Sequence, residues 1–421
     1  MKTAPITALC FLVLAAIAHA QNQPGPREGA AASPYAKWKN GPSGDTNTFP
    51  IAVWLQNPAN AAKYKEIGVN TYLGLWEGPT EEQLAQLKAA GMKVICEQNE
   101  VGLKHLDDPT IIGWMHGDEP DNAQKFDSYW KDDFDKVKQA WPQIEQFKTM
   151  KEYEGYGPPV PPTWIIEDYR KIKAKDPSRP VMLNLGQGVA WEDYIGRGER
   201  TGKLEDYPEY IKGADIVSFD IYPACHDKPQ VHGNLWYVAR GVDRLREWSK
   251  GEKTVWNVLE CTKISHPEGE MATPHQVRCE IWMSLVHGSQ GIVYFVHEFK
   301  PMFREDGVFL YPDVVAEIAK NNKLIAQMAP VINSPTLTGG ARASSSNPAV
   351  PVDIMVKKSG GATYVFSVAM REGETKADFA VSGISGEKRV EVVGEGRTIV
   401  SRDGAFQDDF KAWDTHIYRV E

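Results

Sequence analysis

The chain has 421 residues, with 47 basic and 56 acidic side chains and a formal net charge of −9 at pH 7. This length is enough for one large domain and a small second one. An acidic chain without a basic cluster is poorly suited to bind nucleic acid or an anionic membrane surface, so neither is expected as a partner.

The first twenty residues have the pattern of a secretory leader. A basic start is followed by the apolar run Ala8–Ala18 and by a small-x-small site at residues 18–20. The run is too short to span a membrane, so residues 1–20 are predicted to be a cleaved signal peptide. We therefore expect a secreted or periplasmic protein without a membrane anchor. Residues 21–44, rich in Pro, Gly and Ala, predict an N-terminal arm.

Eight short apolar runs follow between residues 45 and 332. Most are separated by a helical stretch that ends at Gly, such as Glu81–Ala90 before Gly91, and Thr80 and Thr273 have the character of helix N-caps. The runs are continuously apolar rather than alternating, which is typical of a parallel sheet covered by helices. The runs are Ile51–Leu55, Asn70–Leu75, Lys93–Gln98, Ile111–Gly117, Val181–Leu185, Ile216–Ile221, Thr254–Glu260 and Gly291–Val296.

Eight strand–helix units match an α/β fold of the (β/α)8 TIM barrel type in number and size. A doubly wound open sheet is the alternative, but it has fewer strands and usually a glycine-rich first turn. Here the first run is followed by Gln56-Asn57-Pro58 instead, which favours the barrel. The long connection between the fourth and fifth runs contains a charged helix around Lys125–Ala140. It is either a wall of a binding cleft or only a longer connection.

Residues 335–421 differ in character, with short strands separated by Gly and Ser turns. This pattern predicts a small C-terminal antiparallel β-sandwich. No row of aromatic residues is evident in it, which favours stabilisation of the barrel over carbohydrate binding.

Four cysteines follow the leader: Cys96, Cys225, Cys261 and Cys279. None forms a CxxC pair, so no metal site is expected. Cys225 and Cys261 follow consecutive predicted strands, and either a disulfide between them or buried free thiols fits the sequence.

Candidate catalytic residues stand at two strand ends. In a barrel of this kind the reacting groups lie at the carboxyl ends of the strands. Glu119 follows the fourth run and Glu260 ends the seventh. Two carboxylates that converge there have the chemistry needed to cleave a sugar acetal. No phosphate-binding motif is present, and no cofactor is expected.

The other strand ends carry aromatic, amide and acidic side chains, which suit a carbohydrate substrate. Aromatic faces stack on pyranose C–H groups, and amides and acids pair with hydroxyls. For His116, the sequence leaves open whether the side chain contacts the substrate or supports neighbouring residues. The candidate substrate-binding residues are Trp54, Trp76, Asp118, Asn184, Asp220, Tyr222, His297 and Glu298.

An acid after the fourth strand and a Glu ending the seventh resemble clan A of the retaining glycoside hydrolases. Asp220-Ile221-Tyr222 is similar to the clan's site for a tyrosine that hydrogen-bonds the nucleophile. The resemblance covers roughly residues 45–330 and is architectural. One departure is Asp118, because the clan usually has Asn before the acid. An Asp accepts a hydrogen bond from the sugar 2-hydroxyl but cannot donate one.

The resemblance implies a secreted enzyme that hydrolyses β-glycosidic bonds with retention of configuration. Glu119 would protonate the leaving oxygen, and Glu260 would attack the anomeric carbon. The alternative is a non-catalytic glycan-binding protein with the same aromatic rim. It would bind sugar without turnover.

Overall fold

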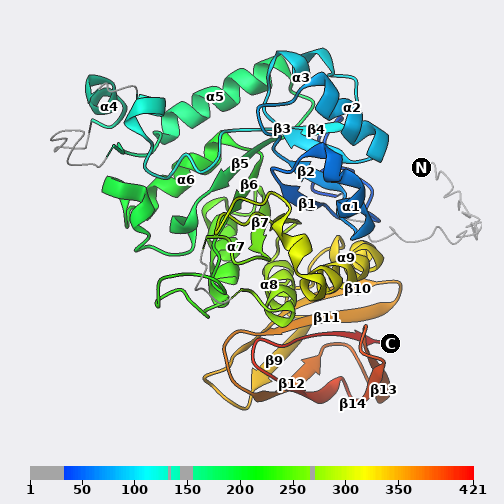
Figure 1. Cartoon of the computed structure of the whole chain (residues 1–421). Helices are drawn as coiled ribbons and strands as arrows, with labels where there is room; N and C mark the ends of the chain where they lie inside the picture. Colours follow the sequence, from blue (N-terminus) through cyan, green and yellow to red (C-terminus); the bar gives the residue numbers. More distant parts are fainter. Residues whose placement is uncertain (1–32, 131–133, 143–154, 266–270) are drawn as a thin grey trace, which may run out of the picture. The chain divides into compact units, whose positions relative to one another are not determined.

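The computed structural model describes residues 33–130, 134–142, 155–265 and 271–421 (Figure 1). The predicted signal peptide lies outside the described residues, so export stays a prediction. Within the described ranges, no helix is both long and apolar enough to cross a bilayer.

Eight parallel strands, β1 to β8, close into a barrel in which β1 pairs with both β2 and β8. This confirms the predicted TIM barrel and excludes the open doubly wound sheet. Every strand begins within one residue of its predicted start. The strands are Ile51–Trp54, Thr71–Leu73, Lys93–Cys96, Ile111–Met115, Val181–Leu185, Ile216–Phe219, Thr254–Glu260 and Gly291–Phe295.

Helices between the strands cover the barrel, and their starts follow the predicted caps. Thr80 and Thr273 each accept a hydrogen bond from a backbone N–H three residues later, in complete capping boxes. Gly91 ends α2 with φ 66, a conformation that glycine adopts without strain. The α-helices described are Ala61–Glu66, Glu81–Ala90, Glu100–Lys104, Phe134–Ala140, Pro162–Lys175, Tyr207–Tyr210, Trp236–Trp248, Pro274–Val286 and Pro312–Ile332, labelled α1 to α9.

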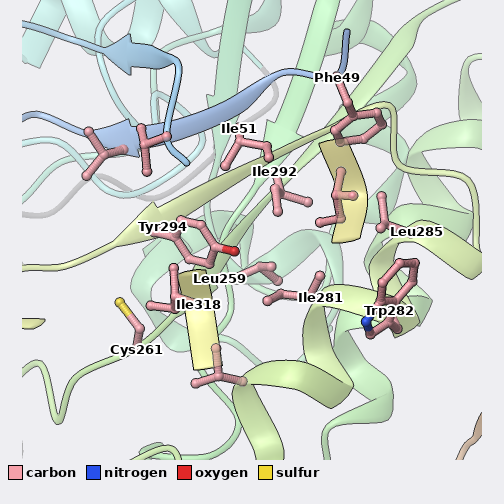
Figure 2. Close-up of a cluster of buried hydrophobic side chains, with 14 of the residues drawn as sticks. Phe49, Ile51, Leu259, Cys261, Ile281, Trp282, Leu285, Ile292, Tyr294 and Ile318 are labelled. Carbon is pink, nitrogen blue, oxygen red and sulfur yellow. The ribbon is translucent and has the colours of Figure 1, made fainter. Parts of the chain in front are cut away.

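The largest core cluster includes a layer between the last barrel strands and the helices α8 and α9. Figure 2 shows Leu259 and Tyr294 from the strands beside Ile281 and Ile318 from the helices. Burying an apolar side chain of this size stabilises the fold by about 1.5–3 kcal/mol. The outward-facing side chains of these strands pack against the helices. This packing holds the carboxyl ends of the strands in fixed positions.

The end of the predicted arm that the structure describes packs against the amino ends of the barrel strands. Tyr35 and Trp38 are buried with the residues that fill the barrel interior. The Tyr35 hydroxyl donates to the Gln290 carbonyl (2.6 Å) and accepts from Trp256 Nε1 (2.8 Å). These contacts close the barrel at the end opposite to the carboxyl ends of its strands.

The C-terminal β-domain is confirmed, and its strands form one antiparallel sheet in the order β10-β11-β16-β13-β14-β15-β12-β9. Ring centroids of Phe379 and Phe406 each lie 4.9 Å from that of Tyr418, across several positions in the strand order. The sheet therefore folds over onto its own core. Strands β9 to β16 are Ala341–Ser345, Val352–Ser359, Ala362–Ala369, Thr375–Val381, Glu387–Val392, Arg397–Arg402, Ala405–Phe410 and Thr415–Val420.

His287, directly after α8, lies between two carboxylates. Its Nδ1 is 2.9 Å from Asp243 Oδ2, and its Nε2 is 3.4 Å from Asp353 Oδ2 on β10. Burial alone would lower the pKa of His287, but the two carboxylates outweigh it and raise the pKa to about 9. The histidine is therefore charged at neutral pH and joins the barrel to the C-terminal sheet.

This raised pKa predicts a pH-dependent contribution to stability. The folded state holds the proton of His287 more tightly than the unfolded state. The contribution is therefore complete below pH ~6.5 and is lost as the pH rises toward ~9. Thermal unfolding of the wild type and His287→Gln across this range should show curves that converge at high pH. A constant difference at every pH would contradict the assignment.

Candidate active site

A cavity of about 1110 Å³ opens at the carboxyl ends of the barrel strands. It brings together eight of the ten residues predicted from the sequence, and the two that do not line it are Glu260 and Glu298. The eight lining residues are Trp54, Trp76, Asp118, Glu119, Asn184, Asp220, Tyr222 and His297.

Glu119 is a half-buried residue whose side chain lines this cavity, four residues after the end of β4. Its backbone φ is 43, in the left-handed region that side chains other than glycine rarely adopt. Strain of this kind persists where surrounding contacts hold a residue in place. Burial raises the pKa of Glu119 well above its usual range, and the charges of Asp220 and Asp118 raise it further. Glu119 therefore keeps its proton and shares a hydrogen bond with Asp220.

Asp118 exposes its side chain to the cavity and is held from one side by an amide. Asn184 Nδ2 donates to Asp118 Oδ1 (3.0 Å), and Asn184 Oδ1 accepts from the Ser218 hydroxyl (2.7 Å). The second bond fixes which end of the amide faces Asp118. Desolvation by the surrounding protein atoms and the charge of Asp220 raise the pKa of Asp118 to about 7.

Asp220, after β6, is the third carboxyl group of this cluster. Burial raises its pKa to about 6, while hydrogen bonds from Glu119 and Tyr222 counter the rise. The pKa of each of the three neighbouring carboxyl groups is therefore raised, and that of Glu119 lies well above its usual range. A carboxyl group that keeps its proton at neutral pH is what a general acid requires.

A buried clamp fixes the loop that carries Glu119. Asp121 Oδ1 accepts from the Gly186 backbone N–H (2.9 Å), and its Oδ2 accepts from the Tyr207 hydroxyl (3.1 Å). Arg197 Nε donates to the Asp121 carbonyl (3.2 Å). These bonds join the loop after β4 to the loop after β5, which limits movement of the Glu119 carboxyl group.

Gly186 leaves no room for a side chain beside Glu119. A Cβ at this position would lie 2.7 Å from Asn122 Oδ1 and 3.0 Å from Glu119 Oε1. Since φ at Gly186 is −80, alanine meets no backbone strain, and its effect is steric. Displacing a catalytic group by about 1 Å can cost up to ~10²-fold in rate.

Gly186→Ala is therefore expected to lower kcat/KM by about 10-fold or more while the melting temperature changes little. Gly117→Ala is the matched control, because a Cβ there meets no atom within 4 Å. Equal activity of the two variants in a hydrolysis assay would argue against tight positioning of Glu119.

Glu260, the second member of the predicted pair, does not line the cavity. It ends β7 but is 0% exposed. Its Oε1 accepts from the Ala224 backbone N–H (2.6 Å), and its Oε2 accepts from the Cys225 backbone N–H (2.9 Å). Both oxygens are thus used by the loop that folds over the strand end, and neither faces the cavity.

Glu280 on α8 is the acidic partner of Glu260. It is fully buried, and burial followed by the Glu260 charge raises its pKa well above the usual range. A side-chain hydrogen bond joins the two carboxyl groups. Glu280 therefore carries the shared proton, and ionised Glu260 is held by this proton and the two backbone amides.

Glu298, also a candidate for substrate contact, does not line the cavity. Its Oε1 accepts from the Tyr311 hydroxyl (2.6 Å) and pairs with Lys263 Nζ at 3.3 Å. Its neighbour His297 lines the cavity, with Nε2 3.2 Å from the Leu55 carbonyl. His116 is buried and bonds to the Gly213 carbonyl (2.8 Å), so it has a supporting position.

Of the two alternatives that the sequence left for Cys225 and Cys261, a disulfide or buried free thiols, the structure has buried free thiols. Cys261 Sγ donates to the Phe295 carbonyl (3.1 Å) and lies with the helix-side core (Figure 2). Cys225 lines the cavity and hydrogen-bonds Glu260. Cys261 is thus part of the apolar core, whereas Cys225 is part of the cavity wall.

Aromatic residues from the loop after β8 line the cavity and were missed in the sequence. Phe299 and Phe303 have ring centroids 5.5 Å apart and are 44% and 59% exposed. Tyr194, in the loop after β5, lines the cavity beside Glu119. These residues lie beyond the strand ends, so no strand pattern marks them. In the part of the chain that the structure describes, no three His, Cys, Asp or Glu side chains are grouped to hold a metal ion.

No known protein family and no curated protein matches this sequence. The chain is similar in structure to a catalytic mutant of a GH42 β-galactosidase from G. stearothermophilus, with 11% identity and a TM-score of 0.51 over 92% of this chain and 100% of that one. An α-amylase from Geobacillus thermoleovorans gives 12% identity and a TM-score of 0.48 over 89% and 98% of the two chains. A GH30 endoxylanase from Clostridium papyrosolvens gives 11% identity and a TM-score of 0.44 over 93% of this chain and 98% of that one. The first likeness shows a common fold.

Proposed function

We propose that this chain is a glycoside hydrolase in which Glu119 is the general acid. The observation that carries the proposal is a carboxyl group that keeps its proton, in a large cavity at the carboxyl ends of barrel strands. Protonation of the leaving oxygen is the step that a glycosidic bond needs before it breaks. Asp220 and Asp118 keep the proton on Glu119 at neutral pH.

The rest of the cavity fits a carbohydrate. Trp76 is 68% exposed at its rim, and Trp54 lines its wall, so flat apolar faces are available for pyranose rings. Asn184 and Gln187 add amide groups for hydroxyls. The predicted leader and the resemblance to clan A support a secreted or periplasmic enzyme that acts on β-linked sugars. A double displacement with Glu260 as the nucleophile is not part of the proposal, because Glu260 is covered by the loop at 224–225.

Hydrolysis of a panel of β-linked oligosaccharides and aryl β-glycosides tests the proposal. The enzyme should release reducing sugar from at least one substrate, and the released anomer can be assigned by NMR. Sugar binding without any product would instead favour a non-catalytic glycan-binding protein, which the same aromatic rim would serve.

The carboxyl cluster predicts the pH dependence of the rate. Activity requires protonated Glu119, so kcat/KM should fall on the alkaline side as this proton is lost. Asp220→Asn removes a nearby negative charge that raises the pKa of Glu119. The alkaline limb of this variant should move to lower pH, and an unmoved limb would contradict the coupling. Apparent values from such profiles belong to the cluster as a whole.

A further inference from the structure

Glu260, the carboxylate at the end of β7, does not line the cavity, so the described strand ends that line it offer only Asp118 and Asp220 beside Glu119. Retaining enzymes need a separation of about 5–5.5 Å between the two carboxyl groups, and inverting enzymes about 6.5–9.5 Å. Asp220 shares a hydrogen bond with Glu119 and is therefore closer than either spacing. The only other described carboxylate lining the cavity beside Glu119 at the strand ends is Asp118. Glu82, Asp227 and Glu305 line it from α2 and from the loops after β6 and β8.

Asp118 is placed to accept a proton from the substrate. Asn184, fixed by Ser218, holds one carboxylate oxygen, and the side chain is exposed to the cavity. Its raised pKa makes it a better acceptor of an N–H proton than an ordinary carboxylate. The same crowding with Asp220 makes a direct attack by Asp118 on carbon unfavourable, since attack requires an ionised and uncongested carboxylate.

An apolar surface adjoins the carboxylates. The Tyr222 ring lies 5.2 Å from the Phe295 ring, and both line the cavity with Val258. A carboxylate acceptor next to an apolar wall matches an acetamido group, which has an N–H on one side and a methyl on the other.

We infer that the sugar at the scissile bond carries a 2-acetamido group, and that this group supplies the nucleophile in place of an enzyme carboxylate. This inference rests on the proposed function. The acetamido oxygen bonds to the anomeric carbon as the glycosidic C–O bond breaks, and Glu119 gives its proton to the leaving oxygen. Asp118 takes the hydrogen bond, or the proton, of the acetamido N–H. Water, deprotonated by Glu119, then attacks the anomeric carbon, and the bond between that carbon and the acetamido oxygen breaks. Asp118 returns any proton it took to the nitrogen, so the acetamido group is restored and the product keeps its configuration.

Paired aryl β-glycosides test this inference. The 4-nitrophenyl glycosides of N-acetylglucosamine and N-acetylgalactosamine are compared with those of glucose and galactose. At least one acetamido sugar should be preferred by about 10²-fold or more, because the attacking oxygen is held within the substrate. A trifluoroacetamido analogue should react more slowly, since fluorine withdraws electrons from the attacking oxygen.

Asp118→Asn adds a second readout. It should slow the acetamido substrate by about 10²-fold and lessen the penalty for the trifluoroacetamido analogue, while Asp409→Asn, on the exposed surface of β15, should change neither. Preference for the plain glycosides would overturn the inference and leave the proposed function standing. No hydrolysis of any glycoside in either test panel would overturn both.

Discussion

Glu119→Gln is expected to lower kcat/KM on oligosaccharides by about 10²–10⁴-fold, the contribution typical of general acid catalysis. Glutamine has the shape of a protonated glutamate but cannot give up a proton at the leaving oxygen. An aryl glycoside with a good leaving group needs little protonation, so its bond-breaking step should be affected less. Steady-state rates on both substrate types measure the difference.

The exposed Glu387→Gln is a matched control for this change. It should leave both rates unaltered. An equal loss on both substrate types, with folding intact by circular dichroism, would remove Glu119 from the role of acid.

Glu260→Ala is expected to have the largest effect on stability. The substitution removes the acceptor for two backbone N–H groups and for the proton of Glu280, all of which are buried. Each unsatisfied buried donor costs about 1–3 kcal/mol, so a total loss of about 3–5 kcal/mol is expected. Denaturant unfolding measures the change.

Glu280→Gln is the matched control, because its amide still donates to Glu260 and its size is unchanged. It also removes a carboxyl group whose raised pKa makes the folded state less favourable as pH rises above ~4.3, the usual value for Glu. Its melting temperature should therefore match the wild type near pH 4.5 and exceed it at pH 8. A small stability loss in Glu260→Ala with complete loss of turnover would instead restore Glu260 as a nucleophile.

The barrel and the β-domain follow from local patterns in the sequence. Runs such as Val181–Leu185 and Thr254–Glu260 are mostly apolar, since both faces of a barrel strand are covered, and their bounds match the observed strands. Strand Ala405–Phe410 is not marked by its sequence, because AFQDDF has too few apolar residues to stand out from a turn. Its antiparallel pairing with Thr375–Val381, rather than its composition, makes this segment a strand.

The candidate site was predicted in its positions but not in its full geometry. Chain order places Asp118, Glu119 and Asp220 at the correct ends of strands, because all strands of a parallel barrel finish at one face. Glu260 also stands at the carboxyl end of a strand, but the loop at 224–225 and Glu280 on α8 enclose it. The two backbone contacts join residues 35 and 36 positions apart, and a strand pattern carries no information about them.

A crystal structure of the Glu119→Gln variant with an oligosaccharide substrate tests the central claim most directly. The glycosidic oxygen of the bound sugar should lie about 2.6–3.2 Å from the side chain of residue 119, inside the cavity lined by Trp54 and Tyr222. A sugar bound elsewhere, or one whose glycosidic oxygen faces away from that side chain, would contradict the account.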